Sequence, residues 1–79
     1  MKPVIYILSH CPYCHKVSDF ASEHNIEIEY KDTGDAAIKQ ELIDRSGKTQ
    51  VPYLVDTANN IEMPESDDII EYLKKNYAK

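Results

Sequence analysis

Residues 4–14 read VIYILSHCPYC, an apolar run that leads directly into a pair of cysteines. Residues 4–8 are continuous, apolar and rich in β-branched side chains, which is typical of a strand buried on both faces. Two polar residues end this run, and Pro12 follows at a point where a helix can begin, because proline fits the first helical position. We therefore expect a strand, a short turn that carries Cys11, and a helix that starts at residue 12.

The rest of the chain continues this alternation of strands and helices. Apolar residues at helical spacing predict helices, and the alternating residues Ile-Glu-Ile-Glu-Tyr predict a half-exposed strand. The predicted elements after the first strand are a helix at 12–24, a strand at 26–30, a helix at 36–46 closed by Gly47, strands at 52–55 and 61–63, and a last helix from Ser66. The order β-α-β-α-β-β-α predicts a single α/β domain over residues 1–79, with a four-stranded mixed sheet and three helices.

The last helix has the clearest start signal. Ser66 is expected to be its N-cap, and Asp67 and Asp68 follow in the first turn, where negative charge is favourable. The apolar residues at helical spacing that are expected to face the core are Ile69, Ile70, Leu73 and Tyr77.

Composition limits the kinds of function. The 79 residues are 42% hydrophobic and carry a net charge of -5, which indicates a globular chain and argues against nucleic acid or an anionic membrane as the partner. The apolar run at residues 4–8 is too short for a signal-peptide core or a membrane span. We therefore expect a cytoplasmic protein, and structural disulfides are rare in that compartment. Two neighbouring cysteines then require a chemical explanation.

Cys11 is predicted to be the N-cap of the first helix. Its sulfur can accept hydrogen bonds from the free amides of Tyr13 and Cys14, and the helix dipole favours negative charge there by about 0.3–1 kcal/mol. Both effects stabilise the thiolate, which is the species that attacks a disulfide. Cys14 lies one turn further along, on the face expected to point to the core. The pair therefore divides into an outer attacking thiol and an inner resolving thiol.

A zinc site is the structural alternative for a Cys-x-x-Cys pair. His10 and His15 flank the cysteines, but Pro12 and the helix that it starts should place the two histidines on different sides. The chain has no second Cys-x-x-Cys pair to complete four ligands. We therefore expect no bound metal and assign neither histidine to the chemistry.

With these features together, the sequence resembles the glutaredoxins over nearly its whole length. The resemblance is carried by Cys-Pro-Tyr-Cys at 11–14, Ser-Gly-Lys-Thr-Gln-Val-Pro at 46–52 and Ser-Asp-Asp at 66–68. It implies a thioredoxin fold, with glutathione as co-substrate and no tightly bound cofactor. It also implies that Pro52 is a cis-proline facing the cysteines, and that the backbone of Val51 pairs with glutathione as an added strand.

The same resemblance implies the remaining glutathione contacts. Tyr13 of the cysteine motif is one of them. Ser66 and Asp67 would hold the γ-glutamyl end of glutathione, with the helix N-terminus facing its carboxylate. Two positions depart from the usual glutaredoxin pattern. Leu8 replaces a frequent lysine, and Pro64-Glu65 replaces a Gly-Gly pair. Residues 64–70 are instead similar to the N-terminal domain of glutathione transferases, where a Glu-Ser pair binds the γ-glutamyl group.

The functional prediction is a monomeric thiol–disulfide oxidoreductase that uses glutathione. Cys11 would attack protein disulfides and glutathionylated proteins, and Cys14 would resolve the mixed disulfide. Two alternatives stay open at this point. One is a thioredoxin-like electron donor recycled by a flavin reductase, which the absence of the lysine favours. The other is a binding module that holds zinc or a dimer-bridging iron–sulfur cluster, which Pro12 disfavours.

Overall fold

The order of elements is the one that the sequence predicts. The structure is a computed structural model, and it describes residues 2–9 and 11–77. Its elements are β1 (Val4–Ile7), α1 (Pro12–Glu23), β2 (Glu29–Asp32), α2 (Ala36–Ser46), β3 (Tyr53–Asp56), β4 (Ile61–Pro64) and α3 (Ser66–Asn76). The predicted fold, a thioredoxin fold with a four-stranded mixed sheet and three helices, is confirmed.

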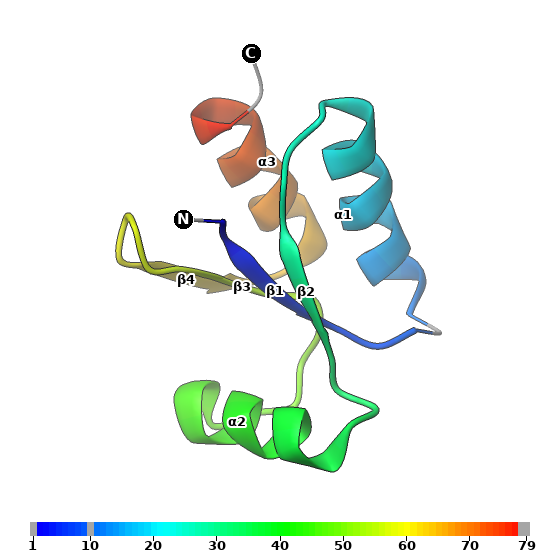
Figure 1. The fold of residues 1–79 in the computed structure, drawn as a ribbon, viewed down its shortest axis with the longest axis vertical. Helices are drawn as coiled ribbons and strands as arrows, with labels where there is room; N and C mark the ends of the chain where they lie inside the picture. Colours follow the sequence, from blue (N-terminus) through cyan, green and yellow to red (C-terminus); the bar gives the residue numbers. More distant parts are fainter. Residues whose placement is uncertain (1, 10, 78–79) are drawn as a thin grey trace.

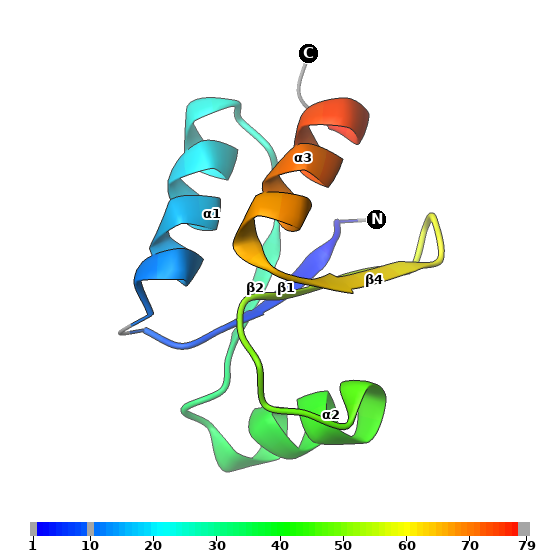
Figure 2. The same cartoon turned by 180° about the vertical axis from the view of Figure 1, so that it is seen from behind.

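The sheet is mixed because its first two strands are joined by a helix and its last two by a turn. Its strand order is β2-β1-β3-β4. β1 runs parallel to β2 and antiparallel to β3, and β3 runs antiparallel to β4. Helices α1 and α3 lie together on one face of the sheet, and α2 lies on the other (Figures 1 and 2). This arrangement places the starts of α1 and α3 on the same side of the sheet.

The central strands are buried on both faces, as the apolar run predicted. Ile5 of β1 lies opposite Leu54 of β3, and both pack against α1 and α3. Their chain neighbours Tyr6 and Val55 point to the other face and pack against Leu42 of α2. A fully buried aliphatic side chain stabilises a fold by about 1.5–3 kcal/mol. The layers around β1 and β3 are therefore the main source of stability for the elements that carry the cysteines.

The predicted strand at residues 26–30 is wrong in its position. The strand that pairs with β1 is β2, three residues later in the chain, and its pairing begins at Glu29 opposite Val4. Ile26 and Ile28 are half-buried and pack against the core before the strand begins. Their alternation with charged residues therefore arises because the α1–β2 connection packs against the core. The sequence pattern alone cannot distinguish such packing from strand pairing.

Other boundaries differ by one or two residues. β1 ends before Leu8, which is 40% exposed, and α1 ends at Glu23. The hairpin strands predicted at 52–55 and 61–63 are Tyr53–Asp56 and Ile61–Pro64, because the ladder pairs Tyr53 with Pro64. Gly47 closes α2 in the left-handed region at φ 78, as predicted.

The predicted cap of the last helix is also wrong. Glu65, not Ser66, is the N-cap of α3, and no side chain caps the helix end. Glu65 has a φ of 76, so the chain turns sharply before the helix. Ser66 is therefore the first helical residue and is buried, with 8% of its surface exposed. Asp67 and Asp68 occupy the first turn, as expected.

Candidate active site

Cys11 lies at the start of α1, where the sequence predicts it. Its backbone is extended, with φ -91 and ψ 115, and its Sγ accepts a hydrogen bond of 3.4 Å from the amide of Cys14. The predicted second bond, from the amide of Tyr13, is not found among the described residues. The Cys11 amide donates to the carbonyl of Leu8 at 3.0 Å, which ties the turn to the end of β1. The partly exposed sulfur is thus held at a helix N-terminus.

Cys14 is in a different environment only three residues away. It is 4% exposed and lies on the core face of α1 with Val17 and Ala21. Burial first, and the neighbouring Cys11 second, raise the pKa of the Cys14 thiol to about 11, although a hydrogen bond with the Leu8 backbone lowers it in part. Cys14 is therefore a protonated, shielded thiol at neutral pH. The two cysteines differ in access and environment as the outer and inner roles require.

A cavity of about 370 Å³ lies beside this turn. The peptide bond between Val51 and Pro52 is cis, as the resemblance implies. The cavity is lined by Tyr13, Gln50, Val51, Pro52, Glu65, Ser66 and Asp67. All five residues that were predicted to contact glutathione are in this set. The fold therefore brings the start of α1, the cis-proline turn and the start of α3 to one concave surface.

Two members of the cavity interact with each other. Gln50 donates from Nε2 to Oε1 of Glu65 at 3.0 Å. The transferase resemblance pointed to Glu65, but sequence reasoning missed Gln50. The one available signal was its place directly before the Val-Pro pair. This bond joins the cis-proline turn to the residue that starts α3, and so holds two walls of the cavity together.

Lys16 is the second residue that sequence reasoning missed. Its Nζ lies 2.6 Å from Oδ1 of Asp67, and the two side chains are 55% and 81% exposed. The ion pair joins α1 to α3 across 51 positions of sequence, so no local pattern indicates it. Asp67, which was predicted to hold the γ-glutamyl end of glutathione, therefore already has one cationic partner.

His15 does not join this arrangement. The Nε2 atom of His15 lies 3.0 Å from the carbonyl oxygen of Ser9 at the surface, and His10 is outside the described residues. Within residues 2–9 and 11–77, no group of three or more histidine, cysteine, aspartate or glutamate side chains could hold a metal ion.

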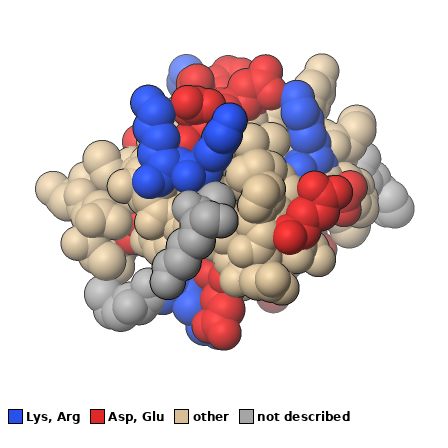
Figure 3. Space-filling view, turned by 90° about the horizontal axis from the view of Figure 1, so that it is seen from above, with Lys and Arg blue, Asp and Glu red and all other residues tan. Residues whose placement is uncertain are grey.

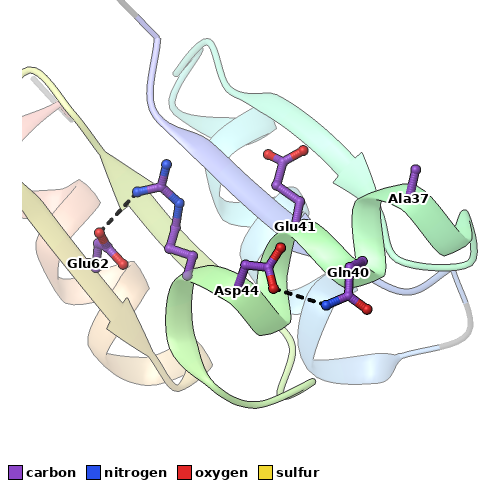
Figure 4. A pocket seen from close by; sticks show the side chains of 6 residues that line it. Ala37, Gln40, Glu41, Asp44 and Glu62 are labelled. Carbon is purple, nitrogen blue, oxygen red and sulfur yellow. Dashed lines mark hydrogen bonds and ion pairs between the residues drawn. The ribbon is translucent and has the colours of Figure 1, made fainter.

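A larger cavity lies elsewhere, between α2 and β4. Its volume is about 620 Å³, and dashed lines in Figure 4 mark one ion pair and one hydrogen bond between the side chains that line it. Arg45 pairs with Glu62 at 3.1 Å, and Gln40 donates to Asp44 at 2.9 Å. These side chains satisfy each other, and no residue of the cysteine turn lines this cavity, whereas Tyr13 of that turn lines the smaller one. The smaller cavity is therefore the candidate site.

The surface carries charges of both signs. On the face shown in Figure 3, basic and acidic side chains are intermixed, and neither sign covers the face alone. None of the helices described is long and apolar enough to cross a membrane.

Comparison with known proteins identifies the family of the chain. The pattern of the family described as "Glutathione S-transferase, N-terminal domain" matches residues 5–79. Glutaredoxin 3 of Escherichia coli (strain K12) is 38% identical over 58 residues, which are 72% of this chain and 70% of the relative. The chain belongs to the glutaredoxin family. Membership of this family makes it a thiol oxidoreductase.

This glutaredoxin-family chain is similar in structure to one part of larger solved proteins. A glutathione S-transferase from the Antarctic clam Laternula elliptica is 28% identical, with a TM-score of 0.79, and the match covers 98% of this chain and 36% of that one. A delta-class glutathione transferase from Nilaparvata lugens is 27% identical, with a TM-score of 0.79, and the match covers 98% and 37%. The chain thus spans little more than a third of these transferases, and the shared part is the thioredoxin-fold domain.

Proposed function

We propose that this chain is a glutathione-dependent thiol–disulfide oxidoreductase that acts as a monomer on protein disulfides and on glutathionylated proteins. The observation that carries the proposal is the contrast between the two cysteines. The partly exposed Cys11 accepts a backbone hydrogen bond at the N-terminus of α1, whereas Cys14 is buried with a pKa of about 11. One thiol is thus equipped to attack and the other is protected until the first has reacted.

The proposed reaction begins at a glutathionylated protein. The thiolate of Cys11 attacks the glutathione sulfur, the protein–glutathione disulfide breaks, and the protein thiolate leaves and takes up a proton. A second glutathione thiolate then attacks the bond between Cys11 and glutathione. The products are glutathione disulfide and free Cys11, so one free glutathione is consumed for each protein thiol that is released.

Reduction of a protein disulfide requires the second cysteine. Cys11 attacks one protein sulfur and forms a mixed disulfide with it. Cys14 loses its proton and attacks the Cys11 sulfur, which releases the reduced protein and leaves a Cys11–Cys14 disulfide. Two glutathione molecules then reduce that disulfide. The burial of Cys14 supports this order, because a shielded thiol does not compete for the incoming protein.

The cavity supports glutathione as the reductant. The backbone of Val51, before the cis-proline, is available to pair with the cysteinyl part of the tripeptide. Ser66 and Asp67 line the other end, at the N-terminus of an 11-residue helix that no side chain caps. Free amides at such a helix end favour a carboxylate. We propose that the γ-glutamyl group binds there.

The test compares two sources of electrons for one glutathionylated substrate. Glutathione with glutathione reductase and NADPH is expected to sustain turnover, whereas thioredoxin reductase with NADPH is not. The alternative, a thioredoxin-like donor, draws support from Leu8, an exposed leucine at a place where a cation would attract glutathione. Turnover with thioredoxin reductase alone would favour that alternative and contradict our proposal. A Cys11→Ser variant is the control for uncatalysed exchange.

A further inference from the structure

The ion pair between Lys16 and Asp67 lies at the edge of the cavity and has no part in the proposed cysteine chemistry. We propose that Lys16 is a specificity-determining residue, which binds the α-carboxylate of the γ-glutamyl group while Asp67 binds its ammonium. This inference rests on the proposed function, because it concerns how the same cavity recognises glutathione. It adds a residue of α1 to a subsite otherwise built from the start of α3.

The position of Lys16 supports this role. Tyr13 lines the cavity, and Lys16 follows it by three residues on α1, so the two side chains lie on the same side of the helix, one turn apart. Asp67 lines the cavity from α3. The contact of 2.6 Å between Nζ of Lys16 and Oδ1 of Asp67 therefore places the ammonium group of the lysine at the cavity edge.

The charges of the cavity explain why a cation is needed there. Its charged lining residues are Glu65 and Asp67, two carboxylates, with no lysine or arginine among the described residues that line it. Two carboxylates attract the ammonium of an α-amino acid but repel its carboxylate. Lys16 supplies the missing charge. When the α-carboxylate of the ligand lies at Lys16 and its ammonium lies at Asp67, each of the four charges is next to a charge of opposite sign.

The start of α3 provides the second contact for the same carboxylate. The first bond of this helix runs from the Ile69 amide to the Glu65 carbonyl at 3.0 Å, so the amides of residues 66–68 precede the helical ladder. No side chain caps them. A carboxylate near these amides also benefits from the helix dipole. We infer that the γ-glutamyl carboxylate binds between this helix end and Lys16.

A purely structural role predicts a different result. The Lys16 and Asp67 side chains are 55% and 81% exposed, and exposed ion pairs contribute little to folding stability. If Lys16 only linked the two helices, its loss would have a small effect on melting temperature and the same effect on every substrate. Discrimination between substrates therefore separates recognition from support of the fold.

The test uses three mixed disulfides of one peptide. The first contains glutathione. The second contains an analogue without the α-carboxylate (4-aminobutanoyl-Cys-Gly), and the third an analogue without the α-amino group (glutaryl-Cys-Gly). With Lys16→Met we expect kcat/KM to fall about threefold to fivefold for the glutathione and glutaryl adducts, through KM, and to stay within about twofold for the 4-aminobutanoyl adduct. Asp67→Asn should show the reciprocal pattern and lose the advantage of the α-amino group.

Lys75→Met is the matched control. Lys75 is an exposed lysine of α3, paired with Glu71 at 3.8 Å, and it lies nine residues beyond the start of the helix. The substitution removes one charge and one surface ion pair, about 13 Å along the helix axis from the start of α3 that lines the cavity. This variant should match the wild type on all three adducts.

Two results with Lys16→Met would overturn the inference. Unchanged or improved turnover of the glutathione adduct would show that Lys16 competes with the ammonium for Asp67. An equal loss on all three adducts would show that Lys16 acts on the fold or on Cys11. Failure of the proposed function is distinct, since the wild-type protein would then not turn over the glutathione adduct with glutathione and its reductase.

Discussion

Asp56 provides the sharpest test of what holds α3 in place. It ends β3, is 1% exposed, and its Oδ2 accepts three hydrogen bonds. Tyr72 and Tyr77 each donate a hydroxyl at 2.5 Å, and Asn59 donates its amide at 3.0 Å. The carboxylate thus fastens the far end of α3 to the β3–β4 hairpin. We predict that Asp56→Asn destabilises the protein with little change in side-chain volume.

The magnitude follows from the charge on this acceptor. A hydrogen bond to a charged group contributes about 1.5–3 kcal/mol, against about 0.5–1.5 kcal/mol for a neutral pair, so three weakened bonds cost roughly 3 kcal/mol. Asparagine also removes the cost of burying a charge, which offsets part of this loss. We expect a net loss of about 2 kcal/mol, or a fall of about 8–16 °C in melting temperature for a domain of this size.

The loss should depend on pH. Burial raises the pKa of Asp56, but the hydrogen bonds from Tyr72, Tyr77 and Asn59 lower it more, so the folded pKa lies below its ordinary value. A depressed carboxyl pKa stabilises the fold above the unfolded pKa of about 3.9, and this contribution is lost as the pH falls through the folded pKa. The difference between wild type and Asp56→Asn should therefore be full at pH 7 and shrink below about pH 4.

Thermal or urea unfolding monitored by circular dichroism at pH 7 and pH 3 measures both effects. Asp19→Asn, at an exposed aspartate of α1, is the control for loss of one negative charge and should change the melting temperature little. A melting temperature of Asp56→Asn within about 2 °C of the wild type at pH 7 would refute the reasoning. So would a difference that stays the same at both pH values, because it could not arise from the ionised carboxylate.

Three further predictions concern the cysteines and the end of α2. Cys11→Ser should abolish exchange, whereas Cys14→Ser should still remove glutathione from a mixed disulfide but lose most protein-disulfide reduction; an inactive Cys14→Ser in the first assay would reverse the assigned roles. In Cys11→Ser, alkylation of Cys14 should be slow at pH 7 and rise toward pH 11, since burial raises its pKa to about 11; rapid alkylation at pH 7 would contradict its shielding. Gly47→Ala should cost about 1 kcal/mol in urea unfolding because residue 47 has a φ of 78, although the added methyl meets no atom within 4 Å; unchanged stability would contradict the strain.

Local chemistry explains why the cysteine turn could be predicted from the sequence. The Cys11 cap depends on a proline one residue later and on an amide three residues later, so all its determinants are within one helical turn. The burial of Cys14 follows from helical spacing in the same way. Gly47 is similar, because the left-handed end of α2 depends on a missing side chain at one position.

The errors arose where a local pattern has more than one physical cause. Alternation at residues 26–30 is compatible with a strand, but it came from packing of a connection against the core. A serine before two aspartates is compatible with a helix cap, but the turn at Glu65 moved the start of α3 so that Ser66 became buried. In both cases the deciding contact is with another element of the fold.

The sequence by itself determined the order of elements, the outer and inner cysteines and, through its resemblance to the glutaredoxins, five of the seven residues that line the cavity. Only the tertiary structure decided which charges meet. Lys16 and Asp67 are 51 positions apart, and Tyr77 donates its hydroxyl to Asp56 although its spacing indicated only an apolar contact. Such pairs depend on how α1, α3 and the hairpin pack. An exposed lysine can reach many partners, and a tyrosine ring can be buried while its hydroxyl finds any nearby acceptor.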